Sequence, residues 1–131
     1  DAPAASLAGQ EVLKVNMPFV PQEVRPGFAA AVKDAALIMD CGPGGLELTA
    51  PGAGKLSAVQ FLAQTLGFSI QDVMALGDSG NDVALLAAAG LGVAMGNAQA
   101  EAIAAARAVT GRNTEGGAAD AIRRWLLEET R

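Results

Sequence analysis

Helical patterns and short apolar runs alternate through the second half of this chain, and this alternation restricts the fold more than any other feature. The apolar runs, each of a length suited to one buried strand, lie at 73–76, 91–95 and 108–110. The helical patterns lie at 55–66, 81–89, 99–106 and 117–128. Such alternation is typical of a parallel sheet with helices on its faces. We therefore expect an α/β fold for this part of the chain.

The first fifty residues follow a different pattern. The elements predicted there are a strand at 11–17, a helix at 26–36 and two strands at 37–41 and 46–49. The segment Gly42-Pro43-Gly44-Gly45 consists of turn-forming residues and separates the last two strands. A strand–helix–strand–strand order predicts a small α+β layer. The segment Pro51-Gly52-Ala53-Gly54 interrupts the pattern, so we divide the chain into residues 1–50 and residues 51–131.

Composition excludes several kinds of chemistry. The chain has 131 residues and no histidine, which rules out histidine acid–base catalysis and histidine-ligated zinc. Its net charge of −5 argues against nucleic acid and anionic membranes as partners. No apolar run reaches the ~18 residues of a membrane span. The single cysteine, Cys41, excludes an internal disulfide and fits a reducing cytoplasm, where we expect the protein to act.

An acidic turn, Gly77-Asp78-Ser79-Gly80-Asn81-Asp82, follows the first apolar run of the second half. Asp78 is predicted at the carboxyl end of a strand and Asp82 in the first turn of the next helix, at the edge where open α/β sheets bind ligands. Two converging carboxylates repel each other, so one resists ionisation unless a cation lies close. Mg²⁺ prefers oxygen ligands and is the natural occupant. The alternative is that these side chains cap a helix.

Four further polar residues lie at positions that suit a ligand site. Lys55 opens a helix, where a cation is slightly unfavourable, so it indicates either a nearby anion or a solvated surface lysine. Asn97 and Asn113 follow the next two strands, where each can serve either as a ligand group or as a turn residue. Thr114, next to Asn113, can equally be the N-cap of the last helix.

The motifs match a known family. The acidic turn is followed by Leu85-Leu86, Ala89-Gly90, Gly92-Val93-Ala94-Met95-Gly96-Asn97-Ala98, Val109-Thr110 and Asn113-Thr114-Glu115-Gly116-Gly117. This string resembles the haloacid dehalogenase superfamily, and most closely its Cof-type sugar-phosphate phosphatases. The resemblance covers residues 45–131 and implies the C-terminal half of a Rossmann-like, three-layer parallel core. Residues 1–50 would then be the C-terminal part of the family's α+β cap.

The resemblance also implies chemistry. It implies Mg²⁺-dependent hydrolysis of small phosphorylated metabolites, of the sugar phosphate class, through an aspartyl-phosphate. Asp78 would bind Mg²⁺ directly, and Asp82 would hold a metal-bound water or orient Asp78. Lys55 would neutralise phosphate, and Asn81 and Asn113 would help to bind it.

One element of the family is missing from the 131 residues. The family's nucleophile lies in an Asp-x-Asp-Gly string, and Asp40-Cys41-Gly42 lacks the paired aspartate. We therefore expect a fragment that is inactive without the N-terminal half of the same protein. The family's missing strand would also leave the edge of strand 73–76 open, which predicts dimerisation. Two alternatives are a phosphorylation-domain piece of a P-type ion pump and a non-catalytic Mg²⁺-binding or regulatory module.

Overall fold

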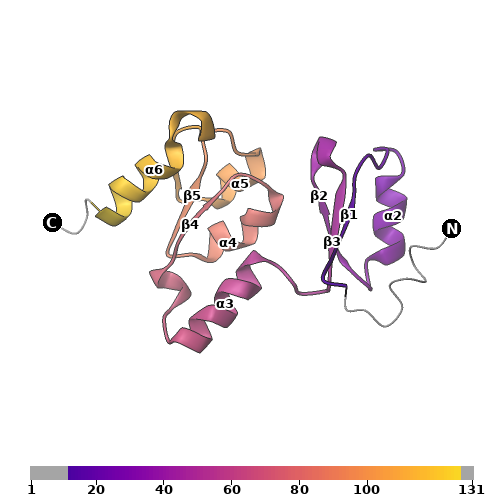
Figure 1. Cartoon of the computed structure of the whole chain (residues 1–131), viewed down its shortest axis with the longest axis horizontal. Helices are drawn as coiled ribbons and strands as arrows, with labels where there is room; N and C mark the ends of the chain where they lie inside the picture. Colours follow the sequence, from indigo (N-terminus) through magenta and orange to yellow (C-terminus); the bar gives the residue numbers. More distant parts are fainter. Residues whose placement is uncertain (1–11, 128–131) are drawn as a thin grey trace. The chain divides into compact units, whose positions relative to one another are not determined.

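The computed structural model describes residues 12–127, which form two compact units that divide between Ala53 and Gly54 (Figure 1). The division lies within the Pro-Gly segment 51–54. The proposed start of the first strand at residue 11 and the end of the last helix at residue 128 lie outside the described residues. No helix in residues 12–127 is long and apolar enough to cross a membrane.

The first unit is a three-stranded antiparallel sheet with one helix. Its elements are β1 (Lys14–Met17), α2 (Arg25–Val32), β2 (Leu37–Asp40) and β3 (Leu46–Thr49), and the sheet order is β1-β3-β2. The predicted strand–helix–strand–strand order is therefore confirmed. The helix is shorter than the predicted 26–36, because the amides of Ala35 and Ala36 both bond to the Val32 carbonyl in a turn that leads into β2. Arg25 anchors the start of α2 through an ion pair with Asp40.

The second unit is a parallel three-stranded sheet in the order β4-β5-β6. Its strands are β4 (Met74–Gly77), β5 (Leu91–Ala94) and β6 (Ala108–Val109). Its α-helices are α3 (Lys55–Leu66), α4 (Val83–Ala88), α5 (Ala100–Ala105) and α6 (Gly117–Ile122). Short 3₁₀ turns lie at Ile70–Asp72, Gly80–Asp82 and Asn113–Glu115, and a π-turn at Arg123–Leu127. The parallel α/β arrangement predicted from the sequence is confirmed.

Element boundaries differ from the sequence-based prediction at two functionally important points. The strand predicted to stop at residue 76 continues through Gly77, whose carbonyl accepts a hydrogen bond of 2.9 Å from the Met95 amide. The helix predicted at 81–89 begins as the 3₁₀ turn Gly80–Asp82, and its α-helical part starts only at Val83. Asp78 therefore follows β4 directly, and Asp82 ends a tight turn rather than lying inside an α-helix.

The core of the second unit lies between the sheet and the helices α4 and α5. Ala75 and Leu86 are buried there together with Ala89 and Ala102. Figure 1 shows α4 beside β4 and β5. The expected apolar face of α3 is largely open. Of that face only Ala63 is buried, while Leu62 and Leu66 stay 47% and 69% exposed because α3 contacts its own unit mainly through α4 and the 3₁₀ turns at 70–72 and 80–82.

Candidate active site

Three loops meet at the carboxyl edge of the parallel sheet. Residues 78–82 follow β4, residues 95–99 follow β5 and residues 110–116 follow β6. The loops are joined directly, since the Gly96 amide donates to the Gly111 carbonyl at 3.0 Å and the Gln99 amide donates to the Asp78 carbonyl at 2.8 Å. The polar residues singled out from the sequence are thus gathered around one edge, as open α/β sheets require for ligand binding.

Asp82 is the only polar residue among residues 12–127 that is fully buried, with 5% of its surface exposed. Its Oδ2 accepts hydrogen bonds from the backbone amides of Asp78, at 2.9 Å, and Ser79, at 3.1 Å. The Ser79 hydroxyl is 3.3 Å from the same oxygen. Gly77 permits this arrangement, because a Cβ on Gly77 would overlap the Asp82 side chain. The carboxylate therefore closes the turn that carries Asp78.

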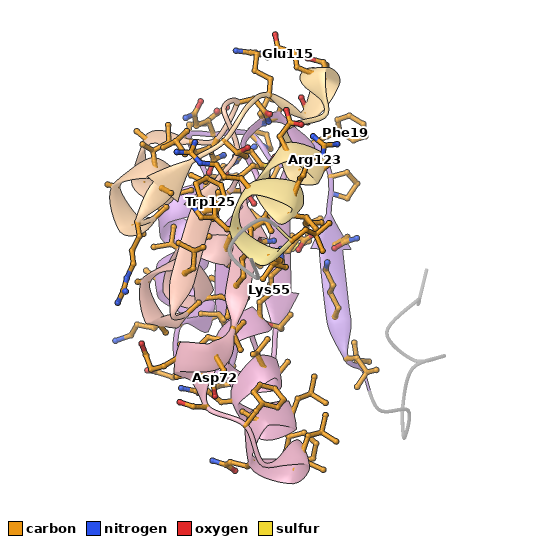
Figure 2. All side chains as sticks on the ribbon, turned by 90° about the vertical axis from the view of Figure 1, so that its left-hand side faces the viewer. Phe19, Lys55, Asp72, Glu115, Arg123 and Trp125 are labelled. Carbon is orange, nitrogen blue, oxygen red and sulfur yellow. The ribbon has the colours of Figure 1, made fainter. Side chains whose placement is uncertain are left out.

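Lys55 neutralises this buried carboxylate. It is the first residue of α3, and its Nζ lies 2.5 Å from Asp82 Oδ1 and 3.1 Å from Asn81 Oδ1. The Lys55 side chain is still 51% exposed, so the ammonium group can also meet a ligand from solvent. Figure 2 labels Lys55 among the side chains. The sequence left open whether Lys55 lies near an anion or is a solvated surface lysine. The ion pair with Asp82 excludes a freely solvated lysine.

Ionisation of Asp82 follows from these contacts. Burial raises the pKa of Asp82, but the Lys55 ammonium and the amides of Asp78 and Ser79 outweigh it, and the net pKa is lowered. Asp82 therefore does not resist ionisation, because the required nearby cation is the lysine of the same chain.

The Asp78 side chain has different partners from those of Asp82. Its side chain is exposed, and its Oδ2 lies 3.5 Å from the Asn97 amide nitrogen. The Asn97 oxygen accepts a hydrogen bond of 2.9 Å from the Asn113 backbone amide. Asp78 and Asp82 are thus separated in role: one carboxylate is fully bonded inside the turn, and the other is open to a ligand.

The two remaining expected phosphate-binding residues differ in how firmly they are held. Asn81 is half-buried, and its side-chain oxygen accepts from Lys55 and from the Ser79 hydroxyl. Asn113 is exposed and lies in the 3₁₀ turn Asn113–Glu115. Thr114 lies in this same turn and is not the N-cap of the last helix, because that position belongs to Gly116.

A Mg²⁺ ion would depend on Asp78. Among the described residues 12–127, no group of three or more acidic, cysteine or histidine side chains is close enough to hold a metal. Mg²⁺ is commonly held by only one or two carboxylates, with water and phosphate oxygens as its other ligands. The exposed Asp78 carboxylate at the sheet edge fits that type of site.

The sequence profile of haloacid dehalogenase-like hydrolases matches residues 10–122. The chain belongs to this family. The resemblance seen in the motifs is therefore confirmed, and the parallel sheet of the second unit is part of a haloacid dehalogenase-type fold.

Similar members of the family are phosphatases. The chain is 46% identical over 90 residues to the 5-amino-6-(5-phospho-D-ribitylamino)uracil phosphatase YcsE of Bacillus subtilis, which covers 69% of this chain and 36% of that protein. It is 32% identical over 117 residues to the phosphatase YbjI of Escherichia coli, of the same description, which covers 89% and 43%. A solved haloacid dehalogenase subclass IIB sugar phosphatase superposes with a TM-score of 0.81 at 28% identity, which covers 92% and 46%. The chain thus spans less than half the length of these relatives.

Gln99 contacts the acidic turn, and motif reasoning misses this residue. It occupies the N-cap of α5, yet its side chain makes no bond to its own helix. Its Oε1 instead accepts a hydrogen bond of 3.0 Å from the Gly80 amide in the acidic turn. Ser, Thr, Asp and Asn are the usual N-caps, so a glutamine at this position was the available signal that the side chain is used elsewhere.

Proposed function

We propose that this haloacid dehalogenase-like chain provides the cation- and phosphate-binding part of a Mg²⁺-dependent cytoplasmic phosphatase. The substrate would be a small phosphorylated metabolite of the sugar phosphate class. The observation that carries the proposal is the difference in burial and bonding partners between the carboxylates of Asp82 and Asp78. Asp82 is buried and bonded to Lys55, while the exposed Asp78 carboxylate lies at the same sheet edge. A fully neutralised Asp82 leaves Asp78 as the available anionic ligand.

Each residue has a distinct part in the proposed site. Asp78 would be the direct Mg²⁺ ligand, and Asp82 would hold the turn and Lys55 in place from behind it. The half-exposed ammonium of Lys55 would bind the substrate phosphate, and Asn81 would keep that ammonium oriented through its 3.1 Å contact. Asn113 would add a polar contact to phosphate. Bound Mg²⁺ would supply charge neutralisation at the phosphoryl oxygens.

The substrate class is supported by the named relatives. Two of them are described as phosphatases of 5-amino-6-(5-phospho-D-ribitylamino)uracil, and a third as a sugar phosphatase. These substrates share a phosphate ester on a polyhydroxylated carbon chain. We propose the same chemical group for the substrate of this protein. We also propose that the first unit, an antiparallel sheet with one helix, is part of the α+β cap of the family.

The attacking group of the reaction would come from outside these 131 residues. No two aspartates in the sequence are two positions apart, so the family's Asp-x-Asp string is absent. The named relatives are more than twice as long as the parts they share with this chain. We propose that the chain alone does not turn over substrate and that an aspartyl-phosphate forms only when a longer protein supplies the nucleophile.

A chimera tests the proposed function. The part of this chain that aligns with the Bacillus subtilis relative, over 90 residues, would replace the matching segment of that protein. Hydrolysis of p-nitrophenyl phosphate would be measured with and without Mg²⁺, for the chimera and for the isolated 131 residues. We expect Mg²⁺-dependent hydrolysis by the chimera and no hydrolysis by the isolated 131 residues. In the chimera, Asp78→Asn should lower kcat/KM by at least about tenfold because a metal ligand is lost. Asp120→Asn changes an exposed carboxylate of α6 and is the matched control.

Three outcomes would contradict the proposal. Full activity of the Asp78→Asn chimera would remove Asp78 from the site. Turnover by the isolated 131 residues would show that no external nucleophile is needed. Mg²⁺ binding by a folded chimera without any hydrolysis would favour a non-catalytic cation-binding module.

We also propose that the isolated chain self-associates through β4. In the described residues β4 pairs only with β5. The carbonyls of Val73 and Gly77 bond to the β5 side, so by strand alternation the backbone groups of Met74 and Leu76 face the open edge. We expect a dimer by light scattering, with amide exchange at Met74 and Leu76 slowing as concentration rises. A monomer at every concentration would contradict this.

A further inference from the structure

We propose that Asn97 and Gln99, in the loop after β5, are positioning residues that hold the Asp78 carboxylate in the direction needed to bind the cation. The inference rests on the proposed function, because it assumes that Asp78 is the cation ligand. It goes beyond that function by assigning roles to two side chains that do not themselves have to touch the substrate or the metal.

Gln99 makes two hydrogen bonds to the acidic turn. Its backbone amide donates to the Asp78 carbonyl at 2.8 Å, and its side-chain oxygen accepts from the Gly80 amide at 3.0 Å. The two bonds bracket the Asp78–Gly80 segment from outside, while Asp82 bonds the amides of Asp78 and Ser79 from inside. The backbone that carries the Asp78 side chain is therefore held from both sides.

Asn97 determines where the Asp78 side chain points. Its oxygen is committed to the Asn113 backbone amide at 2.9 Å, and only an oxygen can accept that hydrogen bond. The amide nitrogen must then face Asp78 Oδ2, which lies 3.5 Å away. One side chain thus connects the loops that follow β4, β5 and β6. At 3.5 Å the contact with Asp78 is loose enough to yield to a bound ion, yet it directs the carboxylate.

Orientation matters because of the kind of ion proposed. Mg²⁺ requires a near-ideal octahedral arrangement and tolerates little displacement of its ligands. Groups that orient a ligating carboxylate typically change metal affinity by about ten- to a hundredfold when they are removed. The competing explanation is that the two side chains merely stabilise the fold. That explanation predicts a change in stability without a change in Mg²⁺ affinity.

The test is a Mg²⁺ titration of the ¹⁵N-labelled 131-residue protein, followed through the backbone amide shifts of Asp78 and Ser79. Gln99→Met removes the acceptor while keeping the length of the side chain, and Asn97→Ala removes the second contact independently. The matched control is Gln71→Met, since Gln71 is also exposed and donates one side-chain bond, of 3.1 Å, to the Ala88 carbonyl. Urea unfolding of every variant gives the stability separately.

We expect Gln99→Met and Asn97→Ala each to weaken Mg²⁺ binding by about tenfold, while Gln71→Met binds like the original protein. Faster amide exchange at Gly80 should accompany the loss in Gln99→Met. Unchanged affinity in both site variants, or an equal loss in Gln71→Met, would overturn the inference and leave the proposed function intact. An original protein that binds no Mg²⁺ would overturn both.

Discussion

Asp82→Ala is expected to lower the free energy of unfolding by about 2–3 kcal/mol, the usual loss when buried hydrogen-bond donors lose a charged acceptor. Asp82 is 5% exposed and accepts hydrogen bonds from Lys55 and from the backbone amides of Asp78 and Ser79. Alanine would leave the two amides without their acceptor inside the turn, and the 3₁₀ turn Gly80–Asp82 would lose its closing contact. Urea unfolding at pH 7 measures the loss.

The control for this prediction is Asp120→Ala, which breaks an ion pair with Arg123 in which both side chains are about 60% exposed. Exposed pairs contribute only about 0–1 kcal/mol. A loss for Asp82→Ala no larger than that of the control would contradict the buried role described above.

The pH dependence provides a second check on Asp82. Its pKa is lowered in the folded protein, so its stabilising contribution is present in full above the unfolded-state pKa of about 3.9. That contribution is lost as the pH falls through the lower folded-state pKa. The difference in stability between the original protein and Asp82→Ala should therefore be constant at neutral pH and narrow below about pH 4. A difference that widens in acid would contradict the assigned direction.

Gly92→Ala is expected to destabilise the second unit by about 3 kcal/mol, at the upper end of the losses caused by overpacking. Gly92 is buried in the central strand β5, and a Cβ there would overlap the backbone carbonyl of Leu86 at the inner face of α4. A backbone group cannot rotate aside as a side-chain end can, so α4 would have to move away from the sheet. Leu86, which is 1% exposed, would then lose its packing.

Gly54→Ala is the matched control for Gly92→Ala. Gly54 has an extended φ of −175° and nothing within 4 Å of an added Cβ. Substitutions at such open sites usually change stability by no more than about 0.5 kcal/mol. Urea unfolding of both variants measures the contrast, and equal stabilities would show that α4 and β5 do not pack as closely as described.

Local sequence predicted the elements of this protein well. The apolar runs at 73–76, 91–95 and 108–110 became the three parallel strands with shifts of one residue, because burial of alternating strands and helices leaves a clear periodicity in the chain. The helix expected at 26–36 ended early, since the turn into β2 is imposed by the sheet and not by the propensity of its own residues. Position at a strand end was also enough to single out Asp78, Asn97 and Asn113.

The partners of the polar side chains were not predictable in the same way. Lys55 and Asp82 are 27 positions apart, and Gln99 meets Gly80 across 19 positions. Nothing in the spacing of the acidic turn distinguishes a carboxylate that faces a metal from one that faces a lysine. The sequence analysis expected one carboxylate to resist ionisation unless a cation lay close, and only the structure shows that the cation beside Asp82 is Lys55.

The amino-acid sequence by itself determined the order of strands and helices, the placement of the acidic turn at the end of a strand and the membership in the haloacid dehalogenase-like family. These features depend on periodicity and on neighbouring residues, which a linear chain displays directly. Only the tertiary structure decided that Asp82 is buried against Lys55, that Asp78 is open and that Asn97 and Gln99 bracket it. Hydrogen bonds and ion pairs act over about 3 Å, so their partners exist only once distant segments have been brought to the same sheet edge.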